Sequence, residues 1–228
     1  MMLLSIDRKK IYFYIFLLFI LLSIHNFKLV SFFNEFFKIN KITLKSDLED
    51  NLNNEIFNTL NQFQNSNIFS LNSKDLKNIL DNYNIINDYK IKIQYPSEIK
   101  IDLEKTKILA FYIEGNDKIF IGSNKKKIKK IYFENKNIPI IIGKFDLSKF
   151  FNLKLYLKNN DFELNNFSKI YSYKSNRWDL LFKNDLLVKL PFDELDESIK
   201  ILKEIINSNK IENVKIIDLR IKDKVILS

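Results

Sequence analysis

The chain has 228 residues, of which 46% are hydrophobic and 29% are charged, and this balance excludes a wholly disordered protein. Its net charge of +9 would suit nucleic acid, but Lys, Asn and Ile are frequent along the whole length, so no basic patch and no nucleic-acid partner is predicted. The absence of Cys and the presence of a single His, His25, exclude disulfides, thiolate sites, a Ser-His-Asp triad and multi-histidine metal sites.

An apolar run follows the basic residues 8–10 near the N-terminus. It is almost unbroken over residues 11–24 and continues with a few polar interruptions to residue 30. At about 1.5 Å per residue, residues 11–30 reach roughly the 30 Å thickness of the hydrocarbon layer. We therefore predict a single transmembrane helix over 11–30, a cytoplasmic tail at 1–10 and an extracytoplasmic remainder, because a basic flank marks the cytoplasmic side.

The same pattern of a basic segment followed by an apolar run also occurs in cleaved signal peptides and in buried helices of soluble domains. No small-residue cleavage site follows the run, because Ala110 is the only alanine of the chain, and an all-round apolar helix beside a basic segment is unusual in a soluble domain. The retained anchor is the prediction. The aromatic residues that follow either continue the helix beyond the bilayer or lie at its interface; they are Phe32, Phe33, Phe36 and Phe37.

Residues 37–107 are predicted to form a small domain with the order strand, helix, helix, strand, strand. A strand is expected at 38–44, and Ser46 with Glu49 has the form of a capping box that starts a helix. A second helix is expected from Ser73, and two alternating strands follow, joined by a turn at Pro96-Ser97. The apolar positions on which this rests are Leu48, Leu52, Ile56, Leu60 and Phe63, then Leu76, Ile79, Leu80 and Tyr83, then Tyr89, Ile91, Ile93, Tyr95, Ile99, Ile101 and Leu103.

Residues 108–228 are predicted to form a mixed, mainly antiparallel β domain. Two helical patterns interrupt its strands, one over 146–156 and one that opens near Asp193 and carries an apolar stripe from Leu195 to Ile206. The fold class is therefore α+β, with the anchor preceding two small domains. Strands are expected at residues 108–113, 118–121, 130–133, 138–142, 178–182, 186–190 and 216–220.

The basic run from Lys125 to Lys130 could attract phosphates, but its place after Gly122 and between two short strands favours a solvated hairpin turn. Trp178, the only Trp, could anchor a ligand, yet the alternation of its neighbours favours core packing.

The acidic group Asp193, Glu194, Asp196 and Glu197 could be an acid/base pair, but the first turn of a helix is the favoured interpretation. With three Gly the chain has no phosphate-cradling loop. No catalytic, cofactor or metal site is predicted.

Six short segments follow one another along nearly the whole chain. They are Asn67-Ile68-Phe69-Ser70-Leu71, Tyr95-Pro96-Ser97-Glu98-Ile99, Ile138-Pro139 with Gly143, Arg177-Trp178-Asp179-Leu180, Lys189-Leu190-Pro191 and Ile217-Asp218-Leu219-Arg220. Each motif alone is weak, but the six in this order resemble the cell-division family FtsQ/DivIB. The departures from the family pattern are Lys107 in place of the usual Pro, Ala110 one residue late, and Gly122-Ser123-Asn124 in place of an Asp-x-x-Gly turn.

This resemblance implies a bitopic, non-enzymatic inner-membrane protein at the division septum, without a cofactor. Its first exported domain would be POTRA-like and would recruit the protein to the division site, and its second would hold the small coiled-coil partners FtsB and FtsL. Other divisome components would be further partners. The family's partner contact lies just after the Asp-Leu-Arg element, which corresponds here to residues 221–227. The expected partner-binding residues are Arg220, Ile221, Val225, Ile226 and Leu227.

An edge strand offers unpaired N–H and C=O groups to which an extended partner can add. Arg220 would bond either to an acidic partner residue or to a carboxylate of its own chain. Two rival functions are an envelope-assembly or transport factor with a POTRA-like domain and a tethered hydrolase that uses carboxylates alone. The first would normally need a membrane β-barrel or more such domains, and neither fits in this length. For the second, nothing in the sequence places a carboxylate pair across a cleft.

Overall fold

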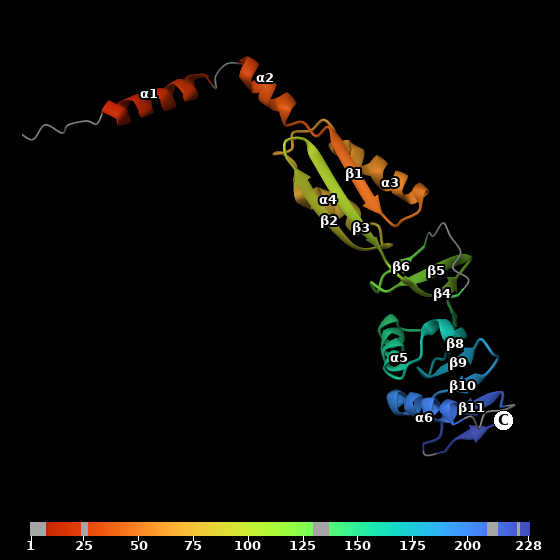
Figure 1. Cartoon of the computed structure of the whole chain (residues 1–228). Helices are drawn as coiled ribbons and strands as arrows, with labels where there is room; N and C mark the ends of the chain where they lie inside the picture. The colour runs from red at the N-terminus through yellow and green to blue at the C-terminus, as the bar shows by residue number, and fades with distance from the viewer. Residues whose placement is uncertain (1–7, 24–26, 130–136, 209–213, 223) are drawn as a thin grey trace, which may run out of the picture. The chain divides into compact units, whose positions relative to one another are not determined.

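The structure is a computed structural model that describes residues 8–23, 27–129, 137–208, 214–222 and 224–228. These residues divide into two compact units (Figure 1). The first unit contains the chain up to Tyr83 together with Asp88–Glu104, and the second contains Asn84–Asn87 together with Lys105–Ser228.

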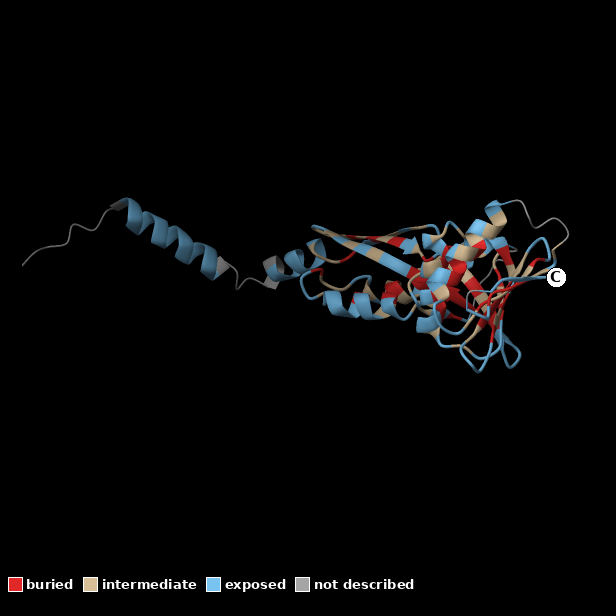
Figure 2. Cartoon of the chain, turned by 90° about the horizontal axis from the view of Figure 1, so that it is seen from below, coloured by how far each residue is buried: buried red, intermediate tan, exposed pale blue. Residues whose placement is uncertain are grey.

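Two helices lie at the N-terminal end, α1 (Arg8–Ser23) and α2 (Phe27–Phe36). Figure 2 shows α1 exposed along its described length, and its large apolar side chains all face outward. No helix of the described chain is both long enough and apolar enough to cross a bilayer. A single membrane-spanning helix over 11–30 is therefore not confirmed, and residues 24–26 of that range lie outside the described residues.

The first unit has the predicted order of strand, helix, helix, strand and strand. Its sheet has the order β1-β3-β2, and β1 runs parallel to β3 from the pair Lys41↔Glu98 to the pair Ser46↔Leu103. One side of β3 is buried, as its alternation predicted, and so are the apolar stripes of both helices. The elements are β1 (Lys41–Ser46), α3 (Asp50–Leu60), a 3₁₀ turn (Asn61–Phe63), α4 (Ser73–Asp81), β2 (Ile86–Gln94) and β3 (Glu98–Lys105).

The predicted capping box of the first helix is wrong. Glu49 is the N-cap of α3 and makes no side-chain cap bond, while Ser46 is the last residue of β1. The Ser46 hydroxyl instead accepts from the backbone N–H of Leu48, at 3.2 Å, in a local turn that competes with helix capping. The second helix does begin at Ser73, where the side chain of Asn72 accepts from the backbone N–H of Lys74.

The second unit is built on a mixed sheet with the order β12-β11-β10-β9-β8-β7-β4-β5-β6. The pairs β10–β11, β7–β8 and β4–β7 are parallel, and the other described neighbours are antiparallel. The strands are β4 (Ile108–Glu114), β5 (Asp117–Gly122), β6 (Lys127–Ile128), β7 (Ile140–Ile142), β8 (Phe167–Ser172), β9 (Trp178–Phe182), β10 (Leu187–Lys189), β11 (Ile216–Asp218) and β12 (Ile226–Leu227).

Helices α5 (Leu147–Asn159) and α6 (Leu195–Asn207) pack on this sheet around one hydrophobic core. Phe150, Leu153 and Leu157 of α5 and Ile199 and Leu202 of α6 are buried there against apolar residues of the strands. Figure 1 shows the two helices side by side, and both begin close to the residues that the sequence predicted. The predicted mixed α+β class is confirmed.

The sequence prediction missed β8. Its pairing with β9 shifts register between Phe167 and Lys169, so Phe167 and Ile170 are buried three positions apart and the strand loses its period of two. The strand expected at 130–133 lies outside the described residues. The strand expected at 216–220 is shorter and ends at Asp218.

Candidate functional site

The candidate site is the sheet edge formed by β12. This strand pairs with β11 through Ile217↔Leu227 and Asp218↔Ile226, and no strand of the described chain lies on its other side. The four apolar residues predicted to bind a partner gather here. Ile221, Val225, Ile226 and Leu227 are between 43% and 52% exposed.

The direction of each backbone group in β12 follows from the hydrogen bonds beside it. Ser228 and Ile216 donate their N–H groups to each other's carbonyl, at 3.0 and 2.9 Å. In an antiparallel ladder such a pair alternates with one whose backbone groups point outward. The N–H and C=O groups of Leu227 and Val225 therefore point away from β11, into the space where a further strand would lie.

A groove lies beside this edge, between α6 and the segment that leads into β12. Its accessible volume is about 210 Å³. Apolar surface from Ile201, Leu219 and Val225 forms part of its lining, and Lys222 Nζ lies 2.7 Å from Glu194 Oε1 at its rim. The groove can take an apolar side chain of a strand that adds to β12.

Arg220 bonds within its own chain. Its guanidinium donates to both carboxylate oxygens of Asp218, with Nε 2.8 Å from Oδ1 and 2.9 Å from Oδ2. This hydrogen-bonded arrangement lowers the pKa of Asp218, and it outweighs the opposing effect of burial. Of the two roles expected for Arg220, the structure contains the intramolecular one, so this cation is held at the start of the segment to β12.

Three of the family-like segments come together on neighbouring strands. In the paired registers, Lys189 of β10 lies opposite Asp179 of β9 on one side and Asp218 of β11 on the other. Opposite charges in such cross-strand positions stabilise a sheet. Asp179, Lys189 and Asp218 thus form a charged row across three strands. The sequence showed the three motifs but not the row, because a motif does not reveal which strands are neighbours.

Asp179 lies buried in this row and is held from two sides. The Tyr173 hydroxyl donates to Asp179 Oδ2 at 3.0 Å, and Arg177 Nε is 3.3 Å from Oδ1 as an ion pair. Burial, followed by the bond to Asp179, raises the pKa of Tyr173. The row thus places a polar cluster on β9, β10 and β11, next to the edge strand β12.

The other candidate residues take structural positions. Trp178 is buried in the core beneath α5, which confirms the packing prediction. Lys125 has φ of 63° in the turn between β5 and β6, which confirms the hairpin over the described part of the basic run, up to Lys129. Asp196 and Glu197 occupy the first turn of α6 as predicted, whereas Asp193 and Glu194 precede it.

No cluster of three or more His, Asp or Glu residues within the described ranges could hold a metal ion. The arrangement at the edge offers outward backbone groups, exposed apolar side chains and a groove, which are the features that strand addition uses in other proteins.

The match to a known protein family falls in the second unit, which contains the candidate site. Residues 115–220 match the family described as "Cell division protein FtsQ/DivIB, C-terminal". The cell division protein FtsQ of Rickettsia bellii (strain RML369-C) is 27% identical over 171 residues, and those of Rickettsia prowazekii (strain Madrid E) and Rickettsia conorii (strain ATCC VR-613 / Malish 7) are 26% and 25% identical. Each match covers 74% of this chain and 64% of the relative.

The chain therefore spans slightly less than two thirds of these relatives, and the expected partner segment at 221–227 lies just beyond the family match. The matched part contains β5 to β11, including the three strands that bear the charged row. The resemblance that the motifs indicated is confirmed: residues 115–220 of this chain match the C-terminal domain of the FtsQ/DivIB cell-division family.

Proposed function

We propose that this chain is a non-enzymatic cell-division protein that holds partner proteins at the sheet edge β12. It would act as a divisome scaffold that links early division proteins to FtsB- and FtsL-type partners and to septal wall synthesis. The family match supports the role in division. The single observation that supports the mode of action is the outward-facing backbone of Val225 and Leu227 beside the groove.

The physical basis is strand addition. A partner segment in extended conformation would pair with the free side of β12, and its alternate side chains would meet Ile226 or the groove. Backbone bonds supply affinity in such complexes, and side-chain pockets supply specificity. Lys222 and Lys224 keep this short edge charged, which reduces pairing with indiscriminate strands.

The proposal includes a place in the cell. Residues 11–30 would anchor the chain in the inner membrane, with residues 1–10 in the cytoplasm and the rest in the periplasm at the septum. The apolar side chains exposed all around α1 support an anchor, since such a surface requires an apolar environment. Residues 37–107 would then be a POTRA-like recruitment domain, and residues 108–228 the partner-binding domain.

The test is co-purification of the full chain with the FtsB- and FtsL-type proteins of the same genome, produced together and solubilised from membranes. The comparison is a chain that ends at Arg220 and so lacks β12. We expect both partners to elute with the full chain and neither with the shortened one, whose fold is checked by circular dichroism. Equal recovery by both folded chains would refute the edge as the site, and failure of both partners to bind the full chain would refute the scaffold role.

A further inference from the structure

A continuous row of aromatic rings lies in the first unit, where α2 joins the rest of the unit. Six rings follow one another with centroid separations from 4.8 to 6.3 Å, a range typical of favourable aromatic pairs. They come from three segments of the chain that are distant in sequence. The aromatic row consists of Phe32, Phe33, Phe36, Phe37, Phe69 and Tyr95.

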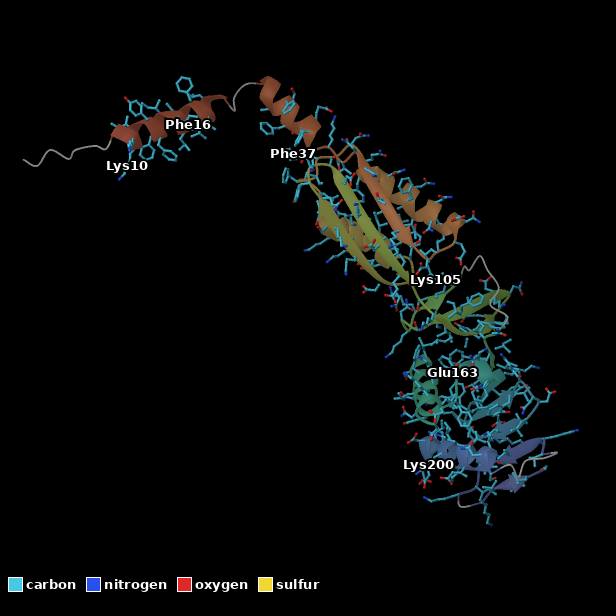
Figure 3. All side chains as sticks on the ribbon, in the orientation of Figure 1. Lys10, Phe16, Phe37, Lys105, Glu163 and Lys200 are labelled. Carbon is cyan, nitrogen blue, oxygen red and sulfur yellow. The ribbon has the colours of Figure 1, made fainter. Side chains whose placement is uncertain are left out.

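The row is held in place by the backbone and not by ring contacts alone. The N–H of Ile68 donates to the carbonyl of Phe37 at 2.9 Å, and Lys38 forms a β-bridge with Asn67. Figure 3 labels Phe37 directly after α2. The centroid of its ring lies 4.8 Å from the centroid of the Phe69 ring. The rings of α2 and those of the unit therefore form one surface.

This surface is open to its surroundings although it is apolar. Phe32, Phe33, Phe36, Phe69 and Tyr95 are each at least 50% exposed. An exposed patch of this kind on a folded unit marks an interaction site. Two of the cations that flank the patch in sequence, Lys38 and Lys41, are each paired with a carboxylate, Glu35 and Glu98 respectively.

The place of the row along the chain indicates what covers it. It begins nine residues after α1 ends at Ser23, and α1 exposes apolar side chains on all sides. Along α2 the aromatic residues recur at helical spacing, with Ser31, Asn34 and Glu35 between them, so the helix is amphipathic. Amphipathic helices with aromatic apolar faces lie in the plane of a membrane interface, where aromatic rings are favoured.

We propose that the aromatic row seats the first unit on the lipid surface at the level of the headgroups. This inference rests on the proposed membrane anchor. Phe69 and Tyr95 enter the interface together with the apolar face of α2, so the unit docks on the bilayer beside its own anchor. Because Lys38 and Lys41 are already paired with carboxylates, ring insertion supplies the attraction at this end of the row, and neutral lipid suffices.

The test uses the absence of cysteine in the chain. The full chain with Ser70→Cys, next to Phe69, is labelled with an environment-sensitive fluorophore and reconstituted in phosphatidylcholine vesicles that contain a lipid with a shallow nitroxide quencher. The reference label is at Lys90→Cys, on β2 and about 16 Å from Tyr95 along the strand. We expect strong quenching at position 70, little at position 90, and no increase when anionic lipid is added.

The matched variants are Phe69→Ser with Tyr95→Ser, and Phe192→Ser as a control that removes an exposed ring of the second unit. In the first variant quenching at position 70 should fall to the level of position 90, and in the control it should not change. Vesicle flotation is measured in parallel. If the chain floats with the vesicles but the labels at positions 70 and 90 are quenched equally and weakly, the docking is overturned. If the label at position 70 changes its fluorescence only when the vesicles hold many copies of the chain, the aromatic row binds a second copy, and this also overturns the docking. A chain that does not float overturns both the anchor and the docking.

Discussion

Ser228 and Ile216 exchange two backbone hydrogen bonds, with N···O distances of 3.0 and 2.9 Å, and thereby set the orientation of the whole edge strand. Because groups alternate along an antiparallel strand, the N–H of Ile226 faces β11, whereas the N–H groups of Val225 and Leu227 face outward. The backbone N–H groups of Val225, directly before β12, and of Ile226, its first residue, thus point in opposite directions, one outward and one toward β11. This difference supplies a matched pair of variants.

Val225→Pro should weaken partner binding without loss of the fold. Proline removes an outward N–H donor, which is worth about 1 kcal/mol or roughly a fivefold increase in Kd. Ile226→Pro, the control, should instead remove a bond to β11 and lower the midpoint of urea unfolding. Titration of the partner and urea melts separate the two effects. An unchanged Kd for a folded Val225→Pro chain would contradict strand addition at this edge.

Asp218→Asn should make the free energy of unfolding depend less on pH in the acidic range. The guanidinium of Arg220 lowers the pKa of Asp218 in the folded state, so this carboxylate stabilises the fold above its unfolded pKa of about 3.9, and the contribution is lost as the pH falls through the folded pKa. The wild-type chain should be more stable than the variant at pH 7, and the gap should close toward pH 2. Urea melts from pH 7 to pH 2 measure it. Asp117→Asn, at an exposed position of β5, controls for the loss of one negative charge.

Gly143→Ala should destabilise the second unit strongly. An added Cβ would lie 2.1 Å from the backbone oxygen of Ser172, and φ at this glycine is +102°. Strain and overpacking together should cost about 3 kcal/mol or more. Gly115→Ala is the control, since φ is +63° there but nothing lies within 4 Å, so only about 1 kcal/mol is expected. Equal melting temperatures of the two variants would contradict the close approach at Gly143.

Phe150→Ala should show how far α5 supports the sheet. Phe150 is fully buried in the core between α5 and the strands, and loss of such a ring costs about 3 to 5 kcal/mol. Phe192→Ala removes a ring that is 55% exposed and should change stability little. Thermal melting of both variants tests this. A small effect at Phe150 would mean that the core closes over the space the ring leaves.

Much of the architecture could be predicted from local sequence alone. The alternation of Ile99, Ile101 and Leu103 identified the buried side of β3, and the stripes of α3, α4 and α6 identified their inward faces. Each of these patterns reports which side of one element avoids water, and a contiguous stretch is enough to show it. The order of short motifs likewise indicated the family, although no motif was specific by itself.

Other features required distant segments to meet. The bulge that hides β8, the neighbouring positions of Asp179, Lys189 and Asp218, and the choice of Asp218 as the partner of Arg220 all depend on which strands pair. Periodicity and motif order are properties of the sequence, whereas strand pairing, the outward groups of β12 and the aromatic row arise only when the tertiary structure brings remote residues together.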